Sequence, residues 1–184
     1  LYCLETICPE CGWQVPLLPS LAVGIRAGKV IAVLNEQEHD FAIDIVSDVD
    51  AAALAQAQEQ GTVRGNALIC PHCEKRTPIA ALRHDRKDEA GNTVYGLRLW
   101  EKNEFQPRPD DVFQERLYAI RYEHREYDAN GKVVQRQRYY CAPGPRDLAN
   151  EAKVQALVAE HFAEWQAAGI VPSMAIEIGL ETER

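Results

Sequence analysis

The chain contains Cys8-Pro9-Glu10-Cys11 and, 58 residues later, Cys70-Pro71-His72-Cys73. A Cys-x-x-Cys step lets a tight turn aim two sulfur atoms at one point, and such a turn is called a zinc knuckle. Two knuckles supply the four-sulfur tetrahedral shell that zinc favours. The sequence therefore predicts a zinc ribbon, in which one structural Zn²⁺ ion is bound by Cys8, Cys11, Cys70 and Cys73.

This motif indicates a metal site more strongly than it indicates an activity. A closed shell of four thiolates leaves zinc no open position for water or substrate. A redox dithiol of the thioredoxin or glutaredoxin kind is one alternative, but it needs one motif and a helix directly after it. Pro16, shortly after Cys11, argues against such a helix. Disulfides and unliganded thiols also remain alternatives to the shared zinc ion.

Other cysteines and histidines show no comparable spacing. Cys3 and Cys141 are expected to be small buried hydrophobic residues, with a ligand role for Cys3 as the alternative. The five histidines form no ligand set, although His72, inside the second knuckle, is an alternative ligand.

Composition places the chain among ordinary globular proteins. It has 184 residues, enough for one core or two small lobes, with 46% hydrophobic and 26% charged residues. We find no apolar segment long enough to span a membrane and no signal peptide, so we expect a reducing, cytoplasmic location. The chain starts at Leu1 and ends at Arg184 without the marks of natural termini. We therefore expect it to be part of a longer protein.

The net charge of -8 disfavours a nonspecific nucleic-acid binder. The charge is unevenly distributed, however. Residues 1–60 hold two Lys and Arg against nine Asp and Glu, whereas residues 61–140 hold fifteen against twelve. Residues 141–184 hold three against seven, so the middle is the only net-positive part.

Between the knuckles we expect strands at 29–34 and 40–46, with a turn at 35–39. A short helix should follow at 51–60, capped by Ser47 or Asp48 and ended by Gly61. A strand at 67–69 then leads into the second knuckle. Zinc would clamp the base of this insertion, and closing so long a loop stabilises a fold by about 4 kcal/mol.

Beyond Cys73 we expect strands at 77–82 and 94–100 around a polar turn at 85–92, and a loop at 103–111. A helix should run from Pro145 to about Ala168, with Gly169 as its stop. Its apolar stripe is expected to be core, and consists of Val154, Leu157, Val158, Phe162 and Trp165. The predicted fold class is α+β, with residues 1–80 and 81–184 as two domains or as one continuous domain.

The clearest hairpin runs from 116–128 through Asn130-Gly131 to 132–141, because Asn-Gly favours a turn with positive φ at both positions. This turn places Tyr122 opposite Tyr139, Ile120 opposite Cys141, Glu123 opposite Arg138 and Arg125 opposite Arg136. One face then carries Ile120, Tyr122, Tyr139 and Cys141. The other is a candidate DNA-contact surface made of Arg121, Arg125, Arg136, Arg138 and Tyr140, with a simple solvated face as the alternative.

Four motifs together resemble one family. They are Cys8-Pro9-x-Cys11-Gly12-Trp13-x-Val15-Pro16-Leu17-Leu18, Gly61-Thr62-Val63-Arg64-Gly65 before the second knuckle, Tyr118-Ala119-Ile120-Arg121-Tyr122, and Trp165-Gln166-x-x-Gly169-Ile170-Val171-Pro172. The chain is similar, from about residue 5 to 183, to the zinc-ribbon region of bacterial and archaeal adenine-specific DNA methylases that contain such a ribbon. One departure is Glu74, which stands where the family usually has Gly after the second knuckle.

The resemblance implies an insertion within an S-adenosylmethionine-dependent methylase, between its cofactor-binding part and its Asp-Pro-Pro-Tyr motif. Neither a Gly-x-Gly loop nor an Asp-Pro-Pro-Tyr motif is present, so we assign no catalytic and no cofactor-binding residues to this chain. S-adenosylmethionine, the rest of the methylase and DNA would be partners of the parent protein, with no membrane partner. The alternatives are a structural or protein-interaction module without DNA contact and a free-standing dithiol oxidoreductase.

Overall fold

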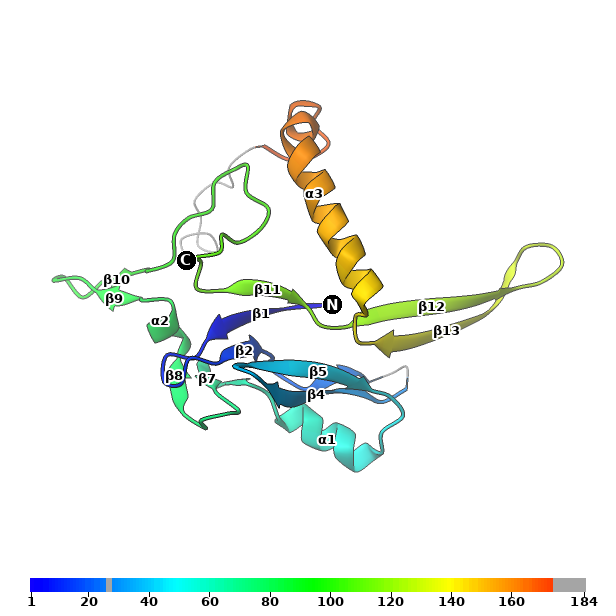
Figure 1. The fold of residues 1–184 in the computed structure, drawn as a ribbon, viewed down its shortest axis with the longest axis horizontal. Coiled ribbons are helices and arrows are strands. Elements are labelled where there is room, and N and C mark those ends of the chain that lie inside the picture. The colour runs from blue at the N-terminus through cyan, green and yellow to red at the C-terminus, as the bar shows by residue number, and fades with distance from the viewer. Residues whose placement is uncertain (26–27, 174–184) are drawn as a thin grey trace. The chain divides into compact units, whose positions relative to one another are not determined.

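The computed structural model describes residues 1–25 and 28–173, so the last residues of the family resemblance lie outside the described part. The fold is α+β, as expected, with short antiparallel strands and a long helix near the C-terminal end of the sequence (Figure 1). It divides into two compact units. The first comprises Leu1–Ile79 and Phe113–Pro143, and the second comprises Ala80–Val112 and the residues from Gly144 onward. The hairpin at 120–141 therefore belongs with the N-terminal residues.

The first unit contains three three-stranded antiparallel sheets. One has the order β11 (Gln114–Leu117), β1 (Tyr2–Ile7) and β2 (Gln14–Leu17). The next has the order β3 (Ala22–Gly24), β4 (Val30–Gln37) and β5 (Asp40–Val46). The last has the order β6 (Val63–Arg64), β7 (Ala67–Ile69) and β8 (Arg76–Pro78). The core of this unit includes Val15, Val30, Phe41, Ala67 and Leu68, all of which are almost fully buried.

The β4–β5 hairpin confirms the expected strand pair. Strand β5 has the expected bounds, and its alternating pattern buries Phe41 and Ile43. Strand β4 runs on to Gln37, so the turn contains only two residues, and His39 has a positive φ of 59°. The turn is shorter than the expected 35–39 because the strand pairing continues to Gln37 and Asp40.

Helix α1 (Ala51–Glu59) lies where it was expected, but its cap does not. Asp50 Oδ1 accepts the Ala53 N–H at 2.7 Å, so the prediction of Ser47 or Asp48 is wrong. The residue directly before the first helical turn reaches its free N–H groups best. At the other end, Gln60 is extended and Gly61 lacks positive φ. A Cβ on Gly61 would lie 2.5 Å from the carbonyl oxygens of Leu18 and Pro19, which identifies close backbone packing as the reason for glycine.

Two predicted strands after the second knuckle are wrong. In place of a strand at 77–82, β8 ends at Pro78 and a short helix, α2 (Ile79–Leu82), follows. An apolar run of four residues after a proline fits a helical turn as well as a strand. In place of a strand at 94–100, β10 contains only Thr93–Val94, paired with β9 (Arg86–Lys87).

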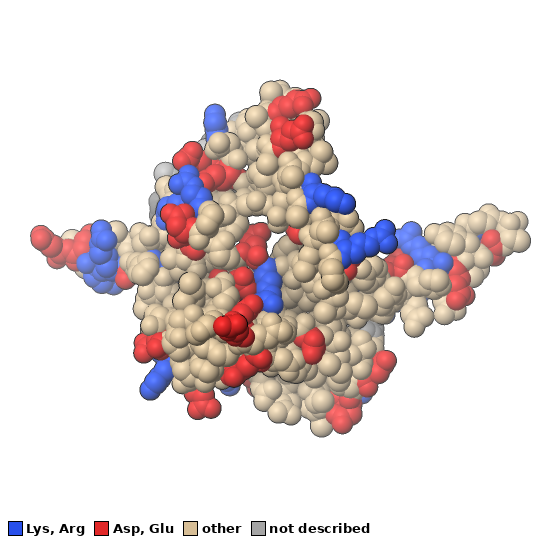
Figure 2. Space-filling model, in the orientation of Figure 1, with Lys and Arg blue, Asp and Glu red and all other residues tan. Residues whose placement is uncertain are grey.

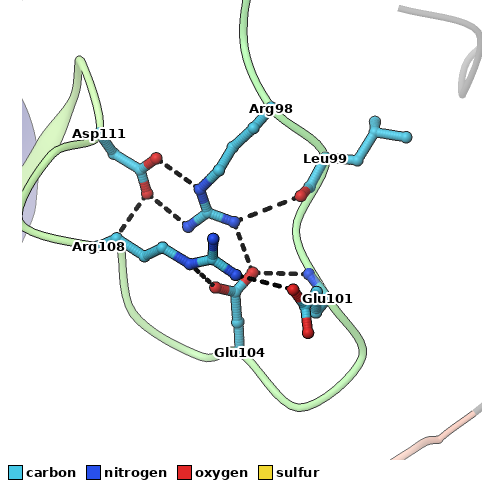
Figure 3. A network of polar contacts seen from close by, with 6 residues as sticks. All are labelled: Arg98, Leu99, Glu101, Glu104, Arg108 and Asp111. Atoms are coloured by element: carbon cyan, nitrogen blue, oxygen red, sulfur yellow. Dashed lines mark hydrogen bonds and ion pairs between the residues drawn. The ribbon is translucent and has the colours of Figure 1, made fainter.

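The expected loop at 103–111 is confirmed, and a network of ion pairs orders it (Figure 3). Arg98 forms a bidentate pair with Asp111, with both N···O distances 2.6 Å, and also reaches Glu104 at 2.6 Å. Arg108 Nε donates to the other Glu104 oxygen at 2.6 Å. The Glu101 backbone N–H and the two guanidinium groups lower the pKa of Glu104 to about 2. Ion pairs therefore hold this loop in place, and the hydrophobic pattern of the sequence does not reveal them.

Helix α3 (Pro145–Ala167) confirms the predicted helix and its end signals, since Gly169 has φ 72°. The expectation that its apolar stripe is core is wrong. No residue of α3 is buried, and Val154 and Leu157 are 55% and 51% exposed. Phe162 does meet Phe105, with ring centroids 5.2 Å apart. Helical spacing shows which side chains share a face, but that face is buried only if other elements, distant in sequence, pack against it.

The hairpin of β12 (Ile120–Tyr127) and β13 (Val133–Cys141) confirms all four predicted residue pairs. Its first strand is shorter than predicted, because Arg116 and Leu117 belong to β11 and pair with β1. Only Gly131 of the Asn-Gly pair has positive φ, 77°. The Gly131 N–H donates to Asp128 O and the register shifts by one at Tyr127, so a longer loop with a bulge replaces the two-residue turn.

Candidate metal centre

The first knuckle forms where β1 ends and β2 begins. Cys8 N–H donates to Trp13 O at 2.7 Å, and Gly12 N–H donates to Cys8 O at 2.8 Å. Gly12 has φ 78°, a left-handed conformation that glycine adopts without a Cβ clash. These two hydrogen bonds turn the chain tightly enough to bring Cys8 and Cys11 to the same side. No helix follows, because β2 starts at Gln14.

The second knuckle, between β7 and β8, repeats this geometry. Cys70 N–H donates to Lys75 O at 3.0 Å, and Glu74 N–H donates to Cys70 O at 2.9 Å. Glu74 has φ 59° and thus takes the left-handed conformation of Gly12. The missing glycine therefore leaves the hydrogen bonding of the second knuckle unchanged, at the cost of local backbone strain.

The two knuckles bring their four thiols together. All four sulfur atoms lie within 4.8 Å of one another, with Cys8 Sγ 3.8 Å from Cys73 Sγ and Cys11 Sγ 3.7 Å from Cys70 Sγ. A tetrahedral site with Zn–S bonds of about 2.3 Å has sulfur atoms about 3.8 Å apart. The cluster fits a metal ion of that coordination. All six cysteines are free thiols.

Each knuckle contributes one buried and one partly accessible sulfur. Cys8 and Cys70 are fully buried, whereas Cys11 and Cys73 are half-buried. Burial raises the pKa of the Cys70 thiol to about 12 and also raises that of Cys11. For Cys73, burial acts to raise the pKa, but the Lys75 backbone N–H and the neighbouring thiols together lower it. A bound cation would favour deprotonation of all four thiols, so binding would release protons.

Aromatic rings link the knuckles beside the sulfur cluster. Trp13, just after the first knuckle, stacks on His72 of the second with centroids 3.8 Å apart and an interplanar angle of 11°. His72 Nδ1 lies 3.2 Å from Glu36 Oε1. The alternative of His72 as a ligand is not supported, since His72 is not among the grouped ligand atoms. Sequence reasoning missed this stack, and the position of Trp13 next to a knuckle was its only signal.

The remaining cysteines lie outside the cluster. Cys3 is buried in β1, as predicted, and burial raises its pKa to about 11. It does not join the metal-binding group. Cys141 is exposed, so the prediction that it is buried is wrong. Cys141 is the last residue of β13 in an exposed hairpin, and sharing a face with Ile120, Tyr122 and Tyr139 does not bury it.

The predicted basic surface is present on the hairpin. Arg121, Arg125, Arg136 and Arg138 are all exposed, and Figure 2 shows basic side chains along this part of the molecule with acidic ones beside them. Glu123 pairs with Arg125 at 2.6 Å and with Arg138 at 2.9 Å. These two partners lower its pKa to about 2. Glu123 thus offsets part of the repulsion expected between Arg125 and Arg136.

Tyr140 differs from the arginines on this face. It is half-buried, and a Cβ on Gly24 would lie 2.9 Å from its ring. Its ring therefore packs on β3 within the first unit. The four arginines, and not Tyr140, form the accessible part of the predicted surface.

Comparisons of the chain with protein-family models, curated proteins and solved structures found no match. Among the helices of the described residues, none has both the length and the apolar character needed to cross a membrane.

Proposed function

We propose that the chain is a zinc-binding structural domain, in which one Zn²⁺ ion held by Cys8, Cys11, Cys70 and Cys73 closes the base of the β3–β4–β5–α1 insertion. The observation that carries this proposal is the pair of matching knuckles with sulfur separations of 3.7 and 3.8 Å. When bound, zinc supplies a closed cross-link and not a reactive position, because the four thiolates complete its shell. The protein residues hold the thiols in place, and Trp13 and His72 pack the two knuckles together.

Elemental analysis tests the metal. We expect about one zinc per chain after purification without added metal. Four-sulfur sites also suit iron, which would give a coloured protein and would contradict the choice of metal. Cys11→Ser should lower the zinc content, whereas Cys141→Ser, a matched change at an exposed thiol outside the cluster, should leave it unchanged. Metal-free protein with full stability would contradict the structural role and would favour redox chemistry.

We further propose that this domain belongs to an adenine-specific DNA methylase and helps to position its DNA. Support comes from the family resemblance and from the four exposed arginines of the β12–β13 hairpin. Among described residues, Arg121 and Arg136 have no carboxylate partner, so both are available to phosphates. The chain itself carries no methyl-transfer chemistry in this proposal, and the parent protein would supply S-adenosylmethionine and the catalytic motif.

A charge-reversal pair tests the DNA contact. Arg121→Glu with Arg136→Glu should weaken DNA binding by the parent protein and reduce the salt slope by about two, since each phosphate contact contributes roughly one. Arg86→Glu with Lys87→Glu changes the same charge on exposed β9 and should have a smaller effect. Equal binding by both double variants would contradict a specific role for the hairpin.

A structural or protein-interaction module is the second candidate. The exposed apolar residues of α3, including Val154 and Leu157, favour it because they are available to another protein surface. Co-purification of a stoichiometric partner, together with no DNA shift in an electrophoretic assay, would support this candidate over DNA positioning.

A further inference from the structure

A groove of about 520 Å³ lies in the first unit, on the side of β4 where α1 packs. Its volume is in the range of sites that bind ligands or peptide side chains. None of the four clustered thiols lines it. Most of its wall is apolar and includes Ile31, Val33, Leu34, Ala53, Ala57 and Ile69.

The groove runs along the edge of β4 and not across one face of the sheet. Four consecutive β4 residues, 31–34, line it. Because successive side chains of a strand point to opposite faces, a cavity that meets all four must lie beside the strand. Helix α1 forms the opposite wall through Ala53, Gln56, Ala57 and Gln60.

This edge carries backbone groups without partners. Ala32 N–H donates to Leu21 O at 2.7 Å, so it points away from β5. Alternate residues of an antiparallel strand point the same way, so the N–H and C=O groups of Leu34 and Glu36 also face outward. Among the described residues, strand β3 pairs with β4 at Val30 and Ile31 alone. In the described part of the chain we find no hydrogen-bond partner for the outward groups of Leu34 and Glu36.

The opposite edge of the same sheet is covered. His39 O accepts from Gln14 N at 2.9 Å, and Phe41 O accepts from Arg116 Nη2 at 2.8 Å. Open edges are unusual, because they invite pairing with another chain. The open edge of β4 lies next to an apolar groove, which is the arrangement that proteins use to bind an added strand.

The rim of the groove supplies a charge. Arg64 lines it, is exposed, and has no ion-pair partner among the described residues. It is one of three Lys and Arg residues in the first 64 positions, a stretch that has nine Asp and Glu. A carboxylate is the complementary group for this unpaired guanidinium.

We propose that this groove binds an extended peptide segment of a partner protein, which adds as a strand to the free edge of β4. The segment places an apolar side chain between β4 and α1 and pairs an acidic side chain with Arg64. Its backbone bonds to the outward N–H and C=O groups of Leu34 and Glu36. This role differs from metal binding and from DNA positioning, since it uses neither the four thiols nor the hairpin arginines, although Pro71 of the second knuckle lines the groove.

A displayed library of random linear dodecapeptides, selected against the zinc-loaded chain, tests the proposal. Enriched peptides should carry Asp or Glu close to an apolar residue. In hydrogen exchange, the Leu34 and Glu36 amides should exchange rapidly in the free protein and become protected with a selected peptide. Val33 and Asn35, whose N–H groups face β5, should be protected in both states.

Two variants sharpen the test. Leu34→Pro removes an outward N–H that the β4–β5 ladder does not use, so the fold should persist while peptide affinity falls about tenfold or more. Arg64→Glu should weaken the binding of acidic peptides by a similar factor. A peptide with Lys in place of its carboxylate residue should bind this variant again. Lys29→Glu, the same charge change outside the groove lining, should have little effect.

Several results would overturn the proposal. They are a library that yields no binder, affinity unchanged by both Leu34→Pro and Arg64→Glu, or protection on binding that appears elsewhere and not at Leu34 and Glu36. Self-association of the wild-type chain that Leu34→Pro abolishes would assign the edge to a second copy instead. If Leu34→Pro fails to fold, the exchange measurement on the wild-type protein still decides the result.

Discussion

Gly61→Ala provides a sharp test of the packing around the insertion. A Cβ at this position would lie 2.5 Å from both Leu18 O and Pro19 O, about 1 Å inside ordinary contact distance. Both neighbours are backbone atoms, so the clash cannot be relieved by turning a side chain. Overpacking of this kind costs about 1–3 kcal/mol. We expect a loss of about 2–3 kcal/mol, because Thr62 next to it also holds this backbone through its bond with Leu18 N at 2.8 Å.

The competing interpretation of Gly61, as a simple helix stop, predicts the opposite sign. Gly61 lacks positive φ, so alanine would fit its backbone conformation. Without the clash, alanine would stabilise the fold by about 0.4–1 kcal/mol, because it lowers the conformational entropy of the unfolded chain. Denaturant unfolding of the zinc-loaded protein measures the difference, which corresponds to a fall in Tm of about 5–10 °C. Gly91→Ala is the control, since its φ of 85° carries a conformational cost but no atom lies within 4 Å of the new Cβ. A Gly61→Ala variant as stable as the wild type would refute the packing argument.

Three further predictions concern Thr62, the metal site and the ion pairs of Glu104. Thr62→Val should cost about 1–3 kcal/mol in denaturant unfolding, because the buried Leu18 N–H and Pro16 O lose their hydroxyl partner, and Thr62→Ser should recover much of the loss. Removal of the metal with a chelator should destabilise the first unit by about 4 kcal/mol, as expected when a cross-link that closes a long loop is lost; an unchanged unfolding midpoint would contradict the clamp. The ion pairs of Glu104 should stabilise the second unit above pH 4.5, where this carboxylate is charged even in the unfolded chain, and their contribution should fade as the pH drops towards about 2. Arg98→Met should flatten that acid dependence in a thermal unfolding series, and an identical pH profile would show that the network contributes nothing.

The features that the sequence predicted well depend on residues close together in the chain. Each Cys-x-x-Cys turn is closed by hydrogen bonds within five residues, so the spacing alone indicated the knuckles. The β12–β13 register followed from the position of its turn, even though only Gly131 takes the left-handed conformation. Likewise, Pro145 and Gly169 marked the ends of α3 through local backbone geometry.

The features that it predicted poorly depend on distant partners. The spacing of Val154 and Leu157 showed that they share a helix face, but whether that face is buried depends on other elements, and here it is exposed. Arg116 was assigned to the hairpin because the residues around it have a strand pattern. In the structure it belongs to β11, which pairs with the N-terminal strand β1. The loop at 98–111 is ordered by ion pairs that no periodic pattern reveals.

The sequence by itself indicated the two knuckles, the positions of β4, β5, β7, α1 and α3, and the pairing of the basic hairpin, because these follow from backbone geometry over a few residues. Tertiary structure decided that the two knuckles meet, since 58 residues separate Cys11 from Cys70 and only packing of the insertion brings them to 3.7 Å. It also decided that Gly61 serves close packing and that, among the described residues, no strand pairs with the outer edge of β4 from Leu34 to Glu36. Burial and edge pairing depend on which distant segments come together, and local sequence does not encode that contact directly.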